Sequence, residues 1–249
     1  MSKHVAVIMG GRSAEREISL ISGSNVAESL RNTGHSVTTI DATHDVEALL
    51  SKLFPRPDVV FNALHGRYGE DGCLQGLLEL MALPYTHSGV LASALAMNKP
   101  VANRLFTQVG IPCPKGKIVH RDEVLAGDVM KRPYVIKPLN EGSSVGVHIV
   151  TDNDESLPFE HTSWPYCDRV MAETYIPGRE LTVGIMDDKA LGVLEIRPKQ
   201  EFYDYEAKYS DDHMAEHIVP ALLPKKDTKE ATRLALLAHQ TLGCRGVSR

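Results

Sequence analysis

The chain has 249 residues, 43% hydrophobic and 24% charged, the composition of a globular protein long enough for one large or two to three small domains. Its net charge of −5 offers no basic face for nucleic acid or an anionic membrane, and no apolar run approaches the roughly 20 residues of a membrane span. No signal peptide is visible and the four cysteines lack metal-ligand spacing, so we expect a cytoplasmic protein with reduced thiols, no zinc, and neither nucleic acid nor membrane as a partner.

Strand and helix signals alternate over the first ~90 residues, which predicts right-handed crossovers and a parallel sheet. Strands are expected at residues 4–9, 36–40 and 58–64, and helices at 14–32 and 74–81. The third strand leads into a charged, glycine-rich loop that begins at His65. Open α/β sheets bind ligands at the carboxyl ends of their strands, although the three glycines could merely permit tight turns.

The order of the helix and strand signals changes towards the carboxyl end. Residues 91–109 have a helical pattern in which Pro100 marks a break or a new first turn. Strands then follow one another, which predicts largely antiparallel sheets of the α+β class: residues 134–137, 145–150, 169–175, 180–186 and 190–196.

A last helix is expected from a capping box at Asp227–Glu230 to Gly243. Its predicted apolar face consists of Leu234, Leu237, Ala238, Thr241 and Leu242. The chain stops at residues 246–249, whose pattern is that of the beginning of another strand, so we expect the sequence to be cut short.

Two segments offer groups that suit anions. In residues 10–17 (GGRSAERE), a Gly-Gly turn exposes backbone N–H groups at the start of a helix, where anions bind favourably. The dinucleotide-binding fingerprint is absent, however, and the two glutamates could simply complement the helix dipole. Lys137 lies in an apolar strand and must either reach solvent or meet an anion. The loop at residues 140–146 could fold over phosphates; the alternative is a hairpin with a flexible tip, in which Lys137 is an edge lysine.

Two further segments suit a nucleotide and a lid. The strand end at Glu173–Ile176 could bind an adenine edge and Glu180 a ribose, or the segment could be a plain strand–turn–strand. Residues 202–209 (FYDYEAKY) place four aromatic side chains among charges. Such side chains favour burial, which a lid closing over a substrate or a protein–protein contact would provide.

Residues 65–76 (HGRYGEDGCLQG), together with the four segments above, resemble the signature of the D-alanine–D-alanine ligases of the ATP-grasp superfamily. The resemblance runs in order along essentially the whole chain. It implies a Rossmann-like amino-terminal domain (1–93) followed by a two-lobed ATP-grasp fold, with a small central domain (94–172) and an incomplete carboxyl-terminal domain (173–249).

The resemblance also implies roles for individual residues. Glu15 would hold the ammonium group of the first D-alanine, in a substrate site with His65 and Tyr209, and Tyr209 would join Glu15 and Ser143 in a hydrogen-bonded set. Arg249 would stabilise the charge of the transition state. The residues implied to bind ATP are Lys99, Lys137, Glu141, Gly142, Ser143, Ser144, Glu173, Ile176, Glu180 and Lys208.

The implied reaction is ATP-dependent ligation of two D-alanines through an acyl phosphate, for peptidoglycan precursor synthesis. A tyrosine at 209, rather than a phenylalanine, points to a dipeptide product. Mg²⁺ or Mn²⁺ is implied, with ligands expected beyond Arg249, so we expect phosphoryl transfer by the chain as given to be impaired. A homodimer is also implied. The alternatives are another ATP-grasp ligase, such as one making D-alanyl-D-lactate, and a non-catalytic ATP-binding module; a Rossmann oxidoreductase is disfavoured.

Overall fold

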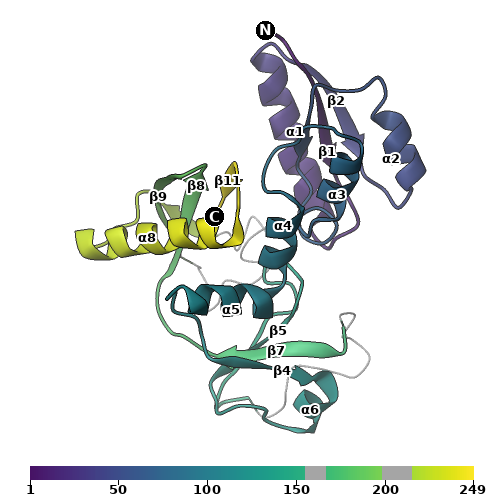
Figure 1. Ribbon diagram of the computed structural model, residues 1–249. Coiled ribbons are helices and arrows are strands. Elements are labelled where there is room, and N and C mark those ends of the chain that lie inside the picture. Colours follow the sequence, from purple (N-terminus) through teal and green to yellow (C-terminus); the bar gives the residue numbers. More distant parts are fainter. Residues whose placement is uncertain (155–166, 198–214) are drawn as a thin grey trace.

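The computed structural model describes residues 1–154, 167–197 and 215–249, and the strands in these ranges form three sheets (Figure 1). The amino-terminal sheet is parallel, with the order β2-β1-β3, as the alternation of signals predicts. Its strands are β1 (His4–Met9), β2 (Ser36–Asp41) and β3 (Val59–Asn62). None of the helices in the described ranges combines the length and apolar character needed to cross a membrane.

The two faces of this sheet bury alternate residues of β1. Val5 and Val7 belong to the cluster beneath α1 (Arg16–Asn32), whereas Ala6 and Ile8 pack with side chains of α2 (Val46–Lys52) and α3 (Cys73–Leu80). Successive side chains of a strand point to opposite faces, so a strand buried on both sides is a continuous apolar run. Because β1 and β3 are parallel neighbours, the loops that follow them both leave the sheet at its carboxyl edge.

Two helices, α4 (Val90–Met97) and α5 (Lys99–Gln108), connect the amino-terminal sheet to the central sheet (Figure 1). The single pattern at residues 91–109 is thus broken at Asn98, whose side chain accepts a hydrogen bond from the backbone N–H of Val101 at 3.2 Å. Pro100 lies in the first turn of α5, where its missing N–H costs nothing.

The central sheet is antiparallel, with the order β4-β7-β5-β6. Its strands are β4 (Gly116–His120), β5 (Tyr134–Pro138), β6 (His148–Val150) and β7 (Arg169–Thr174), and Val124 of α6 (Arg121–Ala126) packs on its core. The strand predicted from residue 145 begins only at His148 because the preceding residues form turns. In these turns Val145 N–H donates to the Gly142 carbonyl at 3.0 Å, and Val147 N–H donates to that of Ser144 at 3.2 Å.

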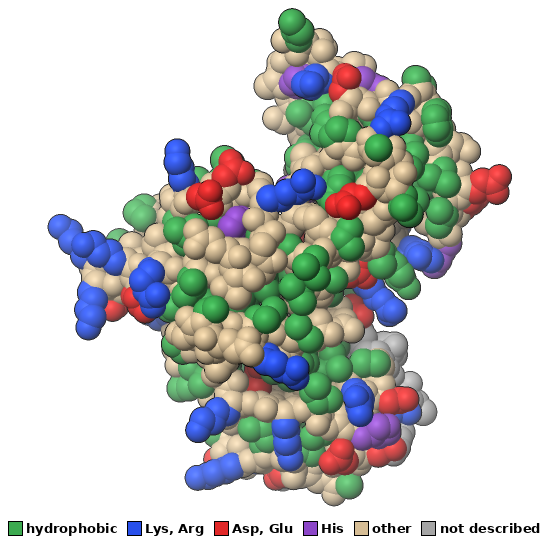
Figure 2. Space-filling view, viewed as in Figure 1, with side chains coloured by type: hydrophobic (Ala, Val, Ile, Leu, Met, Phe, Trp, Pro, Cys, Tyr) green, Lys and Arg blue, Asp and Glu red, His purple; other side chains and the backbone are tan. Residues whose placement is uncertain are grey.

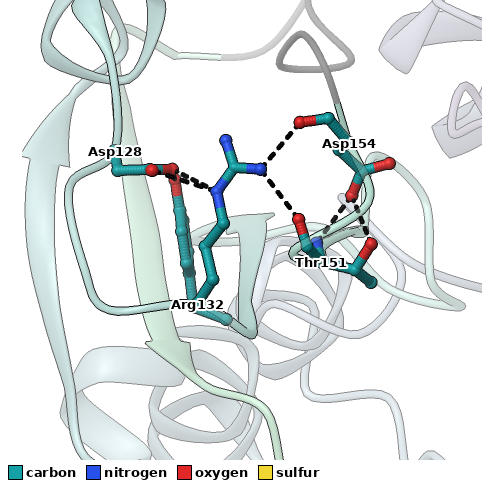
Figure 3. Close-up of polar contacts among 5 residues, drawn as sticks. Asp128, Arg132, Thr151 and Asp154 are labelled. Carbon is teal, nitrogen blue, oxygen red and sulfur yellow. Dashed lines mark hydrogen bonds and ion pairs between the residues drawn. The ribbon is translucent and has the colours of Figure 1, made fainter.

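Arg132 fixes the end of the β5–β6 hairpin that lies away from the glycine-rich loop (Figure 3). Its Nε donates to both oxygens of Asp128 at 2.9 and 3.0 Å, and its Nη1 donates to the carbonyls of Thr151 and Asp154 at 2.8 and 2.7 Å. The hydroxyl of Tyr134 donates to Asp128 at 3.0 Å. The guanidinium of Arg132 also lowers the pKa of the Asp128 carboxyl.

The third sheet is also antiparallel, with the order β10-β9-β8-β11. Its strands are β8 (Glu180–Met186), β9 (Lys189–Arg197), β10 (Glu216–Ile218) and β11 (Val247–Ser248). The side chain of Arg179, the residue before β8, holds the start of that strand against β9. Arg179 donates two hydrogen bonds to the buried carboxylate of Glu195, at 2.8 and 2.5 Å.

Helix α8 (Lys225–Leu242) corrects the prediction of where it begins. It begins after Pro224 with no side-chain cap, so the predicted capping box is wrong: Asp227 lies inside the first turn, and its N–H donates to the Pro224 carbonyl at 3.0 Å. The side chains that pack on the third sheet are Ala231, Ala235 and Leu236. Of the predicted face, Leu242 is buried and the other four residues are half-buried. The left-handed cap at Gly243 is confirmed. Figure 2 shows the basic side chains at the outer end of α8 projecting into solvent.

Candidate active site

The loop after β1 is shaped by glycine and held by serine. Gly10 has φ +79°, and a Cβ on it would collide with the carboxylate of Asp41. Its N–H donates to Oγ of Ser19 at 2.9 Å. Oγ of Ser13 donates to the His65 carbonyl at 2.7 Å and accepts from Glu15 N–H at 3.2 Å. Ser13 therefore ties Glu15 to the loop that follows β3.

The charged residues of that second loop mostly hold the loop itself. Glu70 accepts a hydrogen bond from the Gly66 N–H at 2.6 Å, and Asp71 accepts from the N–H groups of Tyr68 and Cys73 at 2.9 and 3.1 Å. The amide nitrogens of Asn62 and Gln75 both donate to the Gly69 carbonyl at 2.8 Å. Nε2 of His65 lies 3.0 Å from Oγ of Ser22 on α1. This part of the sequence signature thus specifies the conformation of a rigid loop.

Glu15 lies where this loop meets the glycine-rich loop. It is only 5% exposed. A Cβ built on Gly66 would lie 2.5 Å from its Oε2, and one built on Gly142 would lie 2.8 Å from the same oxygen. Both backbones approach the carboxylate this closely because neither residue carries a side chain. A carboxylate removed from water in this way favours a cationic ligand, such as an ammonium group.

Two lysines of the central region lie close to one another and to two glutamates. Lys99, the first residue of α5, donates from Nζ to the carbonyl of Glu141. Nζ of Lys137 pairs with Oε1 of Glu173; the two are diagonal neighbours on one face of β5 and β7. The other carboxylate oxygen of Glu173 is buried and has no hydrogen-bond partner among the described residues.

The pKa values reflect this crowding. Burial, and then the charge of Lys137, lowers the pKa of Lys99 from 10.5 to about 8, against the opposing effect of Glu141 and Glu173. Burial raises the pKa of Glu141, with Arg67 and Lys99 acting in the opposite direction. Two buried lysine charges that repel each other favour an anion between them, because the anion restores the interactions lost with water.

The remaining predicted residues divide into three groups. Ser143 and Ser144 form the tip of the glycine-rich loop, with φ +50° and +62°. Ile176 is 63% exposed, and the side chains of Glu180 and Arg249 are also exposed. Lys208, Tyr209 and the whole predicted lid lie outside the described residues. The structure therefore brings together Glu15, His65, Lys99, Lys137, Glu141, Gly142 and Glu173.

Sequence reasoning gave no role to one residue that joins distant parts of the chain. Nε of Arg245 donates to the carbonyl of His87 at 3.1 Å, and its guanidinium lies 4.8 Å from the centre of the Tyr85 ring. The two segments are 158 residues apart, so no local pattern could have revealed the contact. Arg245 holds the turn between α8 and β11 against the edge of the amino-terminal sheet.

Two family models match the chain. One, described as "D-ala D-ala ligase C-terminus", matches residues 105–249, which is more than half of the chain, and the other, "D-ala D-ala ligase N-terminus", matches residues 47–88. The chain belongs to the D-alanine–D-alanine ligase family. A relative from Rhodospirillum rubrum named D-alanine–D-alanine ligase is 56% identical over 250 residues, covering 100% of this chain and 82% of that protein.

Solved structures agree with this membership. The D-alanine–D-alanine ligase of Bacillus anthracis matches with a TM-score of 0.82 at 33% identity, over 99% of this chain and 81% of that one. The same protein complexed with ATP matches at 0.79 and 32%, over 99% and 80%. VanG D-Ala:D-Ser ligase from Enterococcus faecalis matches at 0.75 and 28%, over 100% and 85%. The predicted Rossmann-like region followed by an ATP-grasp fold is confirmed for this family member.

Proposed function

We propose that this chain joins two D-alanine molecules into D-alanyl-D-alanine at the expense of ATP, for the synthesis of peptidoglycan precursors in the cytoplasm. The observation that carries the proposal is the position of Glu15. Its buried carboxylate lies against the glycine-rich loop, and that loop also contacts Lys99 through the Glu141 carbonyl. A receptor for an ammonium group thus adjoins a receptor for phosphates, as a ligase for amino acids requires.

The reaction follows from the chemistry of a carboxylate, which is a poor electrophile until one of its oxygens becomes a good leaving group. A carboxylate oxygen of the first D-alanine attacks the γ-phosphorus of ATP, the bond to the bridging oxygen breaks, and ADP leaves. The amine of the second D-alanine attacks the carbonyl carbon of the acyl phosphate. The amine loses a proton, and inorganic phosphate leaves through a tetrahedral intermediate. Catalysis then consists mainly of positioning and charge neutralisation.

Each residue of the candidate site would have its own role in this reaction. Glu15 binds the ammonium group of the first D-alanine and so directs its carboxylate towards the nucleotide, while His65 borders the same site. Lys99 and Lys137 neutralise the phosphates, and the N–H groups around Ser143 fold over them. Glu173 holds Lys137 beside the nucleotide. Arg249 would stabilise the developing oxyanion, and Lys208 and Tyr209 would close the site.

A metal and a dimer remain predictions from the family resemblance. Mg²⁺ or Mn²⁺ would neutralise phosphate charge, but the described residues offer no group of three histidine, cysteine, aspartate or glutamate side chains that could hold such an ion. A homodimer is likewise expected from the family.

Mass spectrometry of the products tests the proposal. The 249-residue protein is incubated with ATP, Mg²⁺ and either D-alanine alone or D-alanine with D-serine or D-lactate, while calorimetry measures binding of a non-hydrolysable ATP analogue. ADP and D-alanyl-D-alanine in equal amounts are the expected products, formed slowly, as the expected impairment of phosphoryl transfer implies. A mixed product in preference to the dipeptide would instead indicate a D-Ala:D-Ser or D-Ala:D-lactate ligase. Binding of the analogue without any product would contradict the proposal and support a non-catalytic ATP-binding module.

A further inference from the structure

The amino-terminal sheet carries a cavity that the proposed reaction does not use. The cavity has a volume of 210 Å³ and lies at the carboxyl edge of the sheet, on the side covered by α2 and α3. Its wall is largely apolar and includes Leu49, Leu64 and Leu74. An engineered apolar cavity of about 150 Å³ binds one benzene molecule. This cavity therefore has room for one aromatic ring with a short substituent.

Cationic side chains stand beside the apolar wall. Arg12 and Arg67 both line the cavity, and their guanidinium carbons lie 4.2 and 5.1 Å from the centre of the Tyr68 ring. Arg12 also lies within hydrogen-bond distance of Nδ1 of His44, at 3.2 Å. No carboxylate in the described part of the chain forms an ion pair with either arginine. The lining of the cavity thus includes two cationic groups, with Asp71 and Glu141 as nearby carboxylates that form no ion pair with them.

We propose that this cavity binds a small aromatic carboxylate, with its ring against the leucines and its carboxylate between Arg12 and Arg67. The combination of an apolar wall with a few convergent polar groups is that of ligand pockets in general. An Arg–carboxylate pair gives a charge-assisted, directional contact. Gly11 and His65 also line the cavity, so its occupant contacts the two loops that hold Glu15.

Protection of Cys73 from alkylation tests this proposal without relying on enzyme activity. Cys73 lines the cavity and is exposed, whereas the exposed Cys167 lies outside it and serves as an internal control. The pKa of the Cys73 thiol is raised by burial and by Asp71, so the reaction with iodoacetamide is run at one fixed, mildly alkaline pH. Phenylacetate is the probe, and phenylacetamide is the neutral molecule of the same shape.

Phenylacetate should slow alkylation of Cys73 but not of Cys167, with half-protection near ~1 mM, as is reasonable for a ligand of this size. Phenylacetamide should need about tenfold more, because it lacks the charge-assisted bond. Arg12→Gln should abolish the difference between the two molecules, whereas Arg31→Gln, at an exposed arginine on α1, should preserve it. Equal potency of the two molecules, equal slowing of both cysteines, or no protection of Cys73 would overturn the proposal.

Discussion

Glu15 has an environment that suits only a narrow set of ligands. A buried carboxylate is costly unless it is paired or hydrogen-bonded. Its position is fixed from both sides, by Ser13 on its own loop and by the backbones of Gly66 and Gly142. The backbones of Gly66 and Gly142 both approach the carboxylate. We therefore expect it to bind a cationic group, such as the ammonium group of an amino acid.

Glu15→Gln should therefore weaken D-alanine binding while leaving nucleotide binding unchanged. Losing a charge-assisted hydrogen bond costs about 1.5–3 kcal/mol, or roughly 10- to 100-fold in affinity. Calorimetric titration with D-alanine and, separately, with an ATP analogue measures the two effects. Glu17→Gln is the matched control, because Glu17 is exposed in the first turn of α1. A similar loss of D-alanine affinity in both variants would argue against the role of Glu15.

Lys99 should make nucleotide binding dependent on pH. With its pKa at about 8, the side chain is mostly charged at pH 7 and mostly neutral at pH 9. A neutral amine does not attract phosphates, so affinity for ATP should fall as pH rises through 8. The loss is about tenfold for each pH unit above the pKa if only the charged form binds. Lys137, Glu141 and Glu173 face the same group, and the pKa of Lys99 carries the expected change.

Calorimetry with an ATP analogue between pH 6.5 and 9.5 would check this dependence. Lys99→Met should bind more weakly at pH 7 and lose the slope above pH 8. Lys117→Met, at an exposed position of β4, should keep the slope of the unaltered protein. If Lys99→Met retained the full slope, another group would have to be responsible.

At the scale of elements, the hairpin of β5 and β6 presents its loop to the site while Arg132 fixes its opposite end. Arg132→Met should destabilise the central sheet, because the Thr151 and Asp154 carbonyls lose their donor. Urea unfolding, with hydrogen exchange of β5 and β6 amides, measures the loss. Arg233→Met removes an exposed pair with Glu230 and should lower the unfolding midpoint much less. Equal losses would show that the Arg132 network does not support the hairpin.

The Arg132 network also predicts how the stability of the folded protein changes with pH. Arg132 lowers the pKa of Asp128 in the folded protein below its value in the unfolded chain. The stabilisation is therefore fully present above the unfolded pKa and is lost as pH falls through the folded pKa. The difference in unfolding midpoint between the unaltered protein and Arg132→Met should shrink below about pH 4.

The elements that sequence analysis located correctly are those defined by local patterns. The continuous apolar run of β1 and the glycine cap at Gly243 each depend on neighbouring residues alone. The start of α8 was wrong because Pro224 and Asp227 are both plausible helix starts, and only packing decides between them. Burial of α8 extends beyond the predicted apolar face, because the helix lies near α4 and α5 as well as the third sheet.

In the candidate site, too, the sequence predicts features that depend on neighbouring residues but not those that depend on packing. Glycines and charged residues of the loops were recognisable as chemically special, but their contacts were not. The pairing of Lys137 with Glu173 requires β7 and β5 to be neighbours in the sheet, and residues between these strands give no signal of that order. The contact between Glu15 and Gly142 requires two sheets to meet. Such contacts depend on tertiary packing, which local propensity does not determine.

At the scale of the whole molecule, the proposed amino-acid site and the proposed nucleotide site share a boundary. The amino-terminal sheet supplies Glu15, and the central sheet supplies the glycine-rich loop that lies against it. The loop is also tied to α5, since Lys99 N–H donates to the Leu139 carbonyl at 3.1 Å. A nucleotide that orders this loop must therefore change the surroundings of Glu15, and D-alanine must change nucleotide affinity by the same factor, because binding linkage is reciprocal.

We accordingly expect an ATP analogue to tighten D-alanine binding by roughly 5- to 150-fold, the usual range of coupling between sites. Gly142→Ala should reduce this coupling, because its methyl group would lie 2.8 Å from Oε2 of Glu15 and force the loop and the carboxylate apart. Gly76→Ala is the matched control, since a Cβ at that position of α3 meets nothing within 4 Å. Titrating D-alanine with and without saturating analogue gives the coupling for each protein. Identical D-alanine affinities under both conditions, or undiminished coupling in Gly142→Ala, would mean that the glycine-rich loop does not connect the two sites.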